Sequence, residues 1–236
     1  MLWEILDTGK ASAVENMRYD AALLHSLGQR ENPILHFYDW DKESVTVGHF
    51  IDPNQFLNMQ VFSVQGMDWA HRPTGGGIVF HLWDFAFSVL VPAECSLFSS
   101  NTLDNYATIN HIVLNVVEEF LGTQEEMTLI PEDAELLNQS CASFCMARPT
   151  KYDVVMRGKK IAGAAQRRTK SGFLHQSTIA LVLPDEHLLS QMLLPEANVG
   201  EAIKRHTFAL LKERHLLKEA RLAFKELLTK HIRHVD

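Results

Sequence analysis

Residues 71–81 read HRPTGGGIVFH, with three consecutive glycines between two β-like runs. Because glycine has no Cβ, the backbone amides of such a loop can approach a ligand closely. Arg72 adds a guanidinium that can bind a carboxylate or a phosphate through two parallel hydrogen bonds. No Gly-Lys-Ser/Thr sequence follows, so the stretch is not a P-loop. It predicts either a glycine-rich hairpin turn or a loop that cradles an anionic group.

A second stretch, residues 152–168, reads YDVVMRGKKIAGAAQRR and predicts two strands joined across Arg157-Gly158. A strand-borne lysine followed by small residues, as Lys160 is, can aim its ammonium into a cleft where a ligand fits closely. The alternative is a surface hairpin with exposed lysines, and the pattern alone favours that alternative. An exposed Lys160 would contribute little to stability.

Cys145 lies fifteen residues before Lys160, just before a basic segment. A cationic neighbourhood favours the thiolate form of a cysteine, which suits a nucleophile that forms a thioester. The alternative is a buried, inert cysteine. The odd count of three cysteines makes a disulfide framework unexpected, and no paired Cys or His spacing predicts a metal site.

Along the rest of the chain, hydrophobic periodicity predicts an α+β fold with a largely antiparallel or mixed sheet, because hairpins and scattered helices replace regular strand–helix alternation. Strands are predicted at 2–6, 33–40, 44–47, 61–64, 69–72, 78–81, 85–91, 152–156, 160–166 and 173–183. Helices are predicted at 11–27, 52–58, 103–121 and 187–194, and from 201 nearly to the end. Residues 123–143 are predicted to form an irregular loop. Phe85 and Phe87 alternate as in a half-buried strand.

The chain has 236 residues, of which 46% are hydrophobic and 22% charged, an ordinary globular composition that excludes a mostly disordered chain. No apolar run approaches the roughly 20 residues of a membrane span. The first residues, MLWEILDTGK, carry acids where a secretory signal has a basic flank. We therefore expect a cytoplasmic protein with no membrane partner.

The net charge of −7 is unevenly distributed. Residues 73–147 contain ten acids and no Lys or Arg, whereas residues 148–170 contain eight basic residues opposed only by Asp153. Such a run predicts a solvated basic face, or a site for an anionic group or an acidic partner protein. The overall acidity argues against a nucleic-acid partner.

Together the two quoted stretches resemble the lipoate–protein ligase A family and its octanoyltransferase relatives. Members show an Arg, a small hydroxyl residue, a Gly-rich stretch and Phe/Leu-His in the first motif, and a Lys followed by small residues in the second. The resemblance covers most of residues 1–195, for which it implies a biotin/lipoate ligase-like catalytic domain with a central mixed, largely antiparallel sheet flanked by helices. We expect residues 196–236 to form a helical extension packed on this domain, without a full accessory domain.

The resemblance also implies that an eight-carbon acyl group, lipoyl or octanoyl, is attached to one lysine of a lipoyl carrier domain. Such domains belong to 2-oxoacid dehydrogenase complexes and to the glycine-cleavage carrier protein. Lys160 would contact the acyl carbonyl and phosphate oxygens. The residues that the resemblance places in the acyl-adenylate site are Arg72, Thr74, Gly75, Gly76, Gly77, Ile78, Val79, Phe80, His81 and Gly163.

Two chemistries follow from the resemblance. In the principal prediction, a ligase, lipoate and Mg-ATP give lipoyl-AMP, and the carrier lysine displaces AMP; Gly77 and Phe80 match this pattern. In the alternative, an octanoyltransferase, Cys145 takes octanoyl from an acyl carrier protein as a thioester, with no ATP or Mg²⁺. The short chain favours the alternative, because many ligases carry an extra C-terminal domain, although a separate accessory chain could supply it. A degenerate, non-catalytic member is the third possibility.

Three positions depart from the family's pattern and bear on its finer ligand contacts. Leu82 replaces the acid that commonly follows the motif histidine, and Gln176-Ser177 replaces a common His-Gly. His81 and His175 are each expected to be structural histidines, with a polar role in the site as the alternative.

Overall fold

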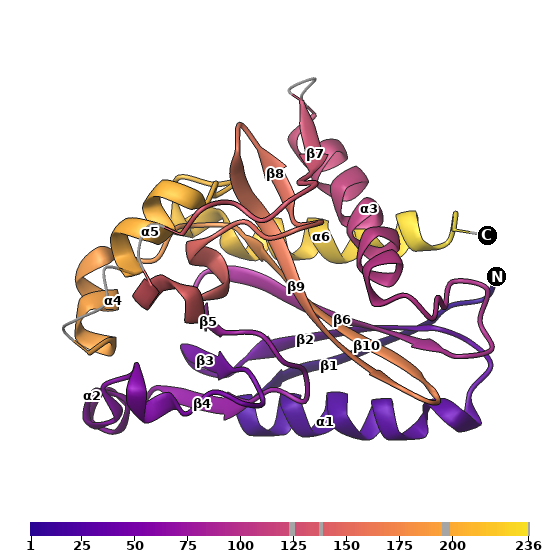
Figure 1. Ribbon diagram of the computed structural model, residues 1–236, viewed down its shortest axis with the longest axis horizontal. Helices are drawn as coiled ribbons and strands as arrows, with labels where there is room; N and C mark the ends of the chain where they lie inside the picture. Colours follow the sequence, from indigo (N-terminus) through magenta and orange to yellow (C-terminus); the bar gives the residue numbers. More distant parts are fainter. Residues whose placement is uncertain (123–125, 137–138, 195–198, 236) are drawn as a thin grey trace.

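The protein is described by a computed structural model that covers residues 1–122, 126–136, 139–194 and 199–235 (Figure 1). Within these residues, seven strands form the main sheet. In spatial order they are β1 (Glu4–Ala11), β2 (Ile34–Trp40), β6 (Asp84–Pro92), β10 (Gly172–Ala180), β9 (Lys159–Thr169), β8 (Val154–Met156) and β7 (Met127–Leu129). A smaller sheet has the order β4 (Asp68–His71), β3 (Ser44–Val47) and β5 (Ile78–His81).

Each sheet contains one parallel pair, β1–β2 in the large sheet and β3–β4 in the small one. The other neighbouring strands run antiparallel. Helices lie on both faces of the main sheet (Figure 1). The predicted α+β class, with a mixed and largely antiparallel sheet flanked by helices, is confirmed.

Helix α1 (Ala13–Ser26) packs on one face of the main sheet. Its start follows from local sequence, because Ser12 accepts a hydrogen bond from the Glu15 amide while the Glu15 carboxylate accepts one from the Ser12 amide. Leu23 and Leu24 then pack against Leu90 and other apolar side chains of the sheet. This face of β6 and β10 carries the polar side chains that later form the site.

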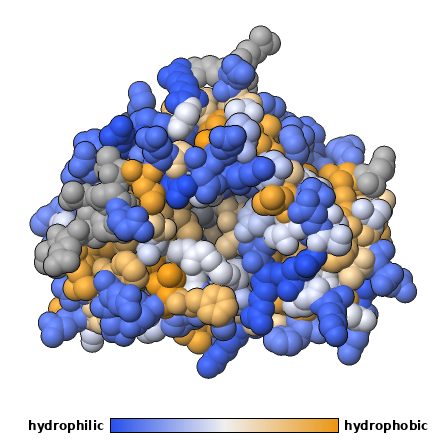
Figure 2. Space-filling view, viewed as in Figure 1, coloured by the Kyte–Doolittle hydropathy of each residue, from blue (hydrophilic) through white to orange (hydrophobic). Residues whose placement is uncertain are grey.

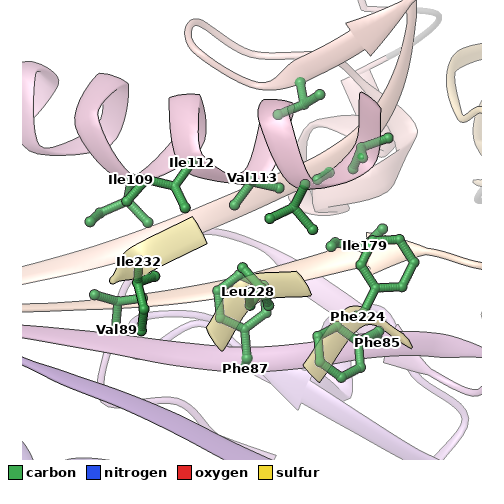
Figure 3. Close-up of a cluster of buried hydrophobic side chains, with 14 of the residues drawn as sticks. Phe85, Phe87, Val89, Ile109, Ile112, Val113, Ile179, Phe224, Leu228 and Ile232 are labelled. Carbon is green, nitrogen blue, oxygen red and sulfur yellow. The ribbon is translucent and has the colours of Figure 1, made fainter. Parts of the chain in front are cut away.

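Helices α3 (Thr102–Leu121) and α6 (Leu217–Ile232) cover the opposite face and enclose the largest hydrophobic core. Figure 3 shows how three layers meet there. The side chains it labels are Phe85, Phe87 and Val89 of β6, Ile179 of β10, Ile109, Ile112 and Val113 of α3, and Phe224, Leu228 and Ile232 of α6. Because helices cover both faces, β6 is buried along its whole length rather than half-buried as its alternation predicts.

A second core joins the small sheet to the short helices α2 (Met59–Gln65), α4 (Glu186–Met192) and α5 (Val199–His206). The strand predicted at 61–64 is wrong, because these residues belong to α2. The two valines there suggest a strand, yet Phe62 is buried while Val64 is 86% exposed. A helical turn satisfies this burial, and Gly66 ends it in the left-handed conformation at φ 65°.

The single helix predicted from residue 201 is also wrong. Between α5 and α6 the chain runs along the ends of β9 and β10, where Phe208 N–H donates to Lys160 O and Leu211 N–H to Leu181 O. These backbone bonds replace helical ones, and no local sequence pattern announces them. The irregular loop predicted at 123–143 contains β7 and a short 3-10 helix at Gln139–Ser143, while residues 123–125 and 137–138 lie outside the described residues.

The division of the chain at residues 195 and 196 stays a prediction. Helix α5 belongs to the second core and α6 to the largest core, so the C-terminal residues pack on the strands of both sheets. Among the described residues no helix has the length and apolarity that crossing a membrane requires.

We expect Phe224→Ala to lower the free energy of unfolding by about 3–5 kcal/mol, because it empties a fully buried site between α6, α3 and β6. Leu222→Ala, on the exposed side of the same helix, should change it by less than about 0.5 kcal/mol. Urea denaturation of both variants measures the difference. Equal losses would contradict the placement of α6 over the core.

Candidate active site

The side chain of Arg72 organises the glycine-rich loop. It is 4% exposed, and its guanidinium points into the loop and toward β3. Nη2 donates to Gly75 O at 3.0 Å and to Gly77 O at 2.8 Å, while Nη1 donates to Thr46 O and Thr46 Oγ1. Nε lies 3.4 Å from Thr74 Oγ1. The chain itself thus uses the donors that the sequence analysis assigned to a ligand.

Cys145 lies against this loop at the start of a short 3-10 helix, Cys145–Ala147. Its Sγ accepts a hydrogen bond from the Gly77 backbone N–H at 3.2 Å, and Arg72 Nη2 is 4.0 Å away. Glycine is required at position 77, because a Cβ there would lie 2.2 Å from Ser143 O. The aromatic rings of Phe144 and Phe80 stack at 5.9 Å. The loop and β5 therefore hold the cysteine segment directly.

Lys160 reaches the same place from β9 and is buried, not exposed as the surface-hairpin interpretation expects. Its Nζ lies 2.7 Å from Asp153 Oδ2 and donates to Cys145 O at 2.8 Å. A Cβ on Gly163 would lie 2.4 Å from that Nζ, so the small residue gives the lysine its space. Thr150 donates to Asp153 through both its N–H and its hydroxyl. The ammonium is thereby held in one position.

These groups line a cavity. Its predicted members are Arg72, Val79, His81, Cys145, Lys160 and Gly163, and its other walls are Met17, Tyr38, Thr46, Met146, Ala164, Ala165, Gln176, Ser177 and Thr178. Figure 2 shows this face of the molecule hollowed near its middle. A second cavity shares Val79, Met146 and Thr178 with the first.

His81 forms a buried dyad with Asp84, whose carboxylate lies 2.6 Å from Nδ1. Burial would raise the pKa of Asp84, but the facing His81 and the hydroxyl of Thr178 hold that pKa below its usual value. Nε2 of His81 lies 2.8 Å from Thr46 Oγ1, which also receives Arg72. His81 therefore contacts the same Thr46 hydroxyl as Arg72 and helps to hold it in place.

His175 lies on the opposite side of β10, beside Tyr106 and Gln166. Burial lowers the pKa of His175 to about 3, so the imidazole is neutral at physiological pH and cannot exchange a proton there. Burial also raises the pKa of Tyr106 to about 12. The structural interpretation of His175 fits these surroundings.

The structure brings most of the predicted site residues together. Gly76 lies beside the thiol, with its ideal Cβ position 3.7 Å from Cys145 Sγ, whereas nothing lies within 4 Å of that position at Gly75. Ile78 and Phe80 line only the second cavity, whereas Val79 lines both. Thr74 is fully buried and donates to Gln176 Oε1.

Sequence reasoning missed Asp153 as a site residue. Its signal was present, since Asp153 is the one acid within the basic run at 148–170. The buried partners Thr46 and Asp20 carry no such signal, because they meet the site only through strand pairing and the packing of α1. Among the described residues, no group of three or more His, Cys, Asp or Glu side chains could hold a metal ion.

Comparison with known proteins shows the family to which the chain belongs. Residues 12–209 match the family described as the lipoyl protein ligase A/B catalytic domain, and the chain belongs to that family. It is accordingly an enzyme of the lipoate ligase and octanoyltransferase type.

Among curated relatives, octanoyltransferase LipM of Bacillus subtilis is 29% identical over 95% of this chain and 84% of its own length. The LipM protein of Lysinibacillus sphaericus is 32% identical over 80% of this chain and 69% of its own length.

Solved structures share the fold. Lipoate-protein ligase A bound with ATP superposes with a TM-score of 0.72 at 24% identity, over 99% of this chain and 86% of the other. A bi-partite lipoate protein ligase of Thermoplasma acidophilum, described with its E2 lipoyl domain, gives a TM-score of 0.70 at 23% identity, over 100% of this chain and 85% of the other.

The burial of His175 predicts an acid-dependent loss of stability. In the unfolded chain this histidine takes up a proton below pH 6.5, whereas in the folded chain it stays neutral down to about pH 3. Unfolding therefore becomes easier as the pH falls through that window. Between pH 7 and pH 5 the free energy of unfolding should fall by about 2 kcal/mol more in the wild type than in His175→Asn.

Urea denaturation at the two pH values measures this difference. Asn can accept the hydrogen bond that Gln166 gives to Nδ1, so the substitution changes chiefly the titration. His234→Asn, at an exposed position, should follow the wild type. Parallel pH dependence in His175→Asn and the wild type would contradict the neutral, buried histidine.

Proposed function

We propose that the chain is an octanoyltransferase that moves an octanoyl group from an acyl carrier protein to a lysine of lipoyl domains through a thioester on Cys145. The observation that carries the proposal is the cavity in which the Cys145 thiol receives the Gly77 N–H beside the buried Lys160 ammonium. The relatives named octanoyltransferase LipM support the same chemistry.

The transfer takes two balanced steps. First, the Cys145 thiolate attacks the carbonyl carbon of the carrier thioester, a new C–S bond forms, and the carrier sulfur leaves and takes up a proton. Second, the neutral amine of the acceptor lysine attacks the Cys145 thioester, an amide C–N bond forms and the C–S bond to Cys145 breaks. The proton that the amine nitrogen loses goes to the departing Cys145 sulfur, which restores the thiol. The free energy comes from the donor thioester, so no nucleotide is required.

Each buried group has a role in these steps. The Gly77 N–H stabilises negative charge on Sγ, both as nucleophile and as leaving group. The ammonium of Lys160 supplies positive charge for the oxyanion that develops on the acyl carbonyl oxygen. Asp153 fixes that ammonium in place, so little reorganisation is needed during the reaction. Apolar walls such as Met17 and Val79 suit an alkyl chain.

The lipoate ligase that uses ATP and Mg²⁺ and forms lipoyl-AMP has weaker support. Gly77 and Phe80, which match the ligase pattern, have another explanation here, because they hold the segment that carries Cys145. Arg72 already spends its donors on the loop. Asp153, the carboxylate beside the cavity, is occupied by Lys160 and Thr150 and is poorly placed to bind Mg²⁺.

The acceptors we propose are the lipoyl domains of 2-oxoacid dehydrogenase complexes and the glycine-cleavage carrier protein. Lys151, Arg167, Arg168 and Lys170 remain exposed in the basic run, which suits an acidic carrier. Retention of Arg72, Cys145 and Lys160 around one cavity argues against a degenerate, non-catalytic member.

The direct test incubates the protein with an apo lipoyl domain and either an octanoyl carrier protein without ATP or lipoate with Mg-ATP. Intact-mass analysis should show octanoylation without ATP. Cys145→Ser should abolish it, because an alkoxide is a far poorer leaving group than a thiolate, whereas Cys95→Ser should retain it. ATP-dependent lipoylation that survives in Cys145→Ser would establish the ligase instead.

The role of Lys160 in acyl transfer cannot be tested by truncating its side chain. Lys160→Ala would leave the buried Asp153 carboxylate without its cation, at a cost of about 3–5 kcal/mol, so lost activity could reflect unfolding.

We expect Gly163→Ala to displace the ammonium instead, since the new Cβ would lie 2.1 Å from Lys160 Cε, and to slow octanoyl transfer about a hundredfold. Gly200→Ala, whose Cβ would be 3.4 Å from its nearest neighbour, is the matched control. Initial rates of both variants, compared with their melting temperatures, give the result. Full activity in Gly163→Ala would remove Lys160 from the mechanism.

A further inference from the structure

We infer that Gln176 is a positioning residue that ties the glycine-rich loop, and through it the Cys145 thiol, to a buried Asp20–His36 pair. The inference deepens the proposed function and rests on it for the role of Cys145 as nucleophile. Gln176 is also a position where the chain departs from the family's pattern, in which His is common.

The contacts of Gln176 join two parts of the fold. From β10 its Oε1 accepts the hydroxyl hydrogen of Thr74 at 2.7 Å, and its Nε2 donates to Asp20 Oδ2 at 2.6 Å. The amide is 6% exposed, and Thr74 and Asp20 are fully buried. A side chain of the main sheet therefore connects the loop after β4 to helix α1.

The polarity of these bonds is fixed by chemistry. Asp20 as a carboxylate only accepts, and it already receives Ser88 Oγ at 2.6 Å and faces His36 Nδ1 at 2.8 Å. The amide nitrogen of Gln176 must therefore face Asp20, which leaves its oxygen for Thr74. The Thr74 hydroxyl then donates to Gln176 and keeps a lone pair for Arg72 Nε.

This chain of bonds ends at the reacting atom. Thr74 begins the loop whose last glycine, Gly77, donates its N–H to Cys145 Sγ. The guanidinium of Arg72 lies across the loop and donates to both Gly75 O and Gly77 O, so these two carbonyl groups are held in place. Holding Thr74 in place therefore holds the Gly77 N–H toward the sulfur.

Glutamine suits this place because a neutral amide presents the same donors and acceptor at every pH. A histidine there presents one donor and one acceptor when neutral and two donors when protonated. Because Gln176 does not titrate, its hydrogen bond to Thr74 stays intact over the pH range in which a histidine would take up a proton.

Alkylation of Cys145 by iodoacetamide tests the link without any acyl donor. We use a Cys95→Ser background, in which the other remaining cysteine, Cys141, is fully buried. Gln176→Met should slow alkylation at pH 7 about tenfold, because the thiolate loses a well-placed N–H donor. Thr74→Val should give the same loss, and the two substitutions combined should give no further loss.

Ser88→Ala is the matched control, since it removes a donor from the same Asp20 oxygen without touching Thr74. It should lower the melting temperature and leave the alkylation rate within about twofold. Gln176→His keeps a donor for Asp20 and, in its neutral form, an acceptor for Thr74, so it should be alkylated faster than Gln176→Met at pH 8.

Peptide mapping decides the outcome. Alkylation of Cys145 in Gln176→Met and Thr74→Val as fast as in Ser88→Ala, with Cys141 protected, would overturn the inference. If Gln176→Met unfolds the protein and exposes Cys141, the Cys145 alkylation rate of Thr74→Val decides the test, because that variant breaks the same hydrogen bond at its loop end. Because alkylation requires no octanoyl donor, a protein that fails to transfer octanoyl groups can still pass or fail this test.

Discussion

The site depends on the buried guanidinium of Arg72. A buried cation is costly unless its donors are satisfied, and this one is satisfied by the carbonyl oxygens of the glycine-rich loop and by Thr46 of β3. The loop therefore wraps around the cation, with Gly76 at a φ of 83° that other residues rarely adopt. That wrapping aims the Gly77 N–H at Cys145.

A second buried cation complements the first. Lys160 and Asp153 are both about 3% exposed, and the pair is anchored by Thr150 and by the backbone of Cys145. Arg72 follows β4 of the small sheet, and Lys160 lies in β9 of the main sheet. Arg72 lies near the sulfur of Cys145, and Lys160 donates to its carbonyl oxygen. In the proposed mechanism these two groups stabilise the charge on the sulfur and on the acyl oxygen, and both are in place before substrate binds.

Much of this could be predicted from the sequence, because it depends on local signals. Helix α3 follows from three- and four-residue apolar steps and the stop at Gly122, and both motifs were visible as quoted stretches. The two wrong predictions concern elements that depend on distant contacts. Residues 61–64 form part of α2 despite their two valines, because a helix buries Phe62. Residues 207–211 are not helical, because their backbone bonds to the ends of β9 and β10. Lys160 could not be recognised as buried, since its partner Asp153 lies just before the neighbouring strand β8, whose pairing with β9 shifts register.

The proposed mechanism requires that Cys145 carries the acyl group. The most direct measurement incubates the protein with an octanoyl carrier protein, without acceptor and without ATP, and follows intact mass and peptide mapping. We expect one octanoyl group on Cys145, which hydroxylamine should release because the linkage is a thioester. An unmodified Cys145 in a protein that still acylates lipoyl domains would contradict it.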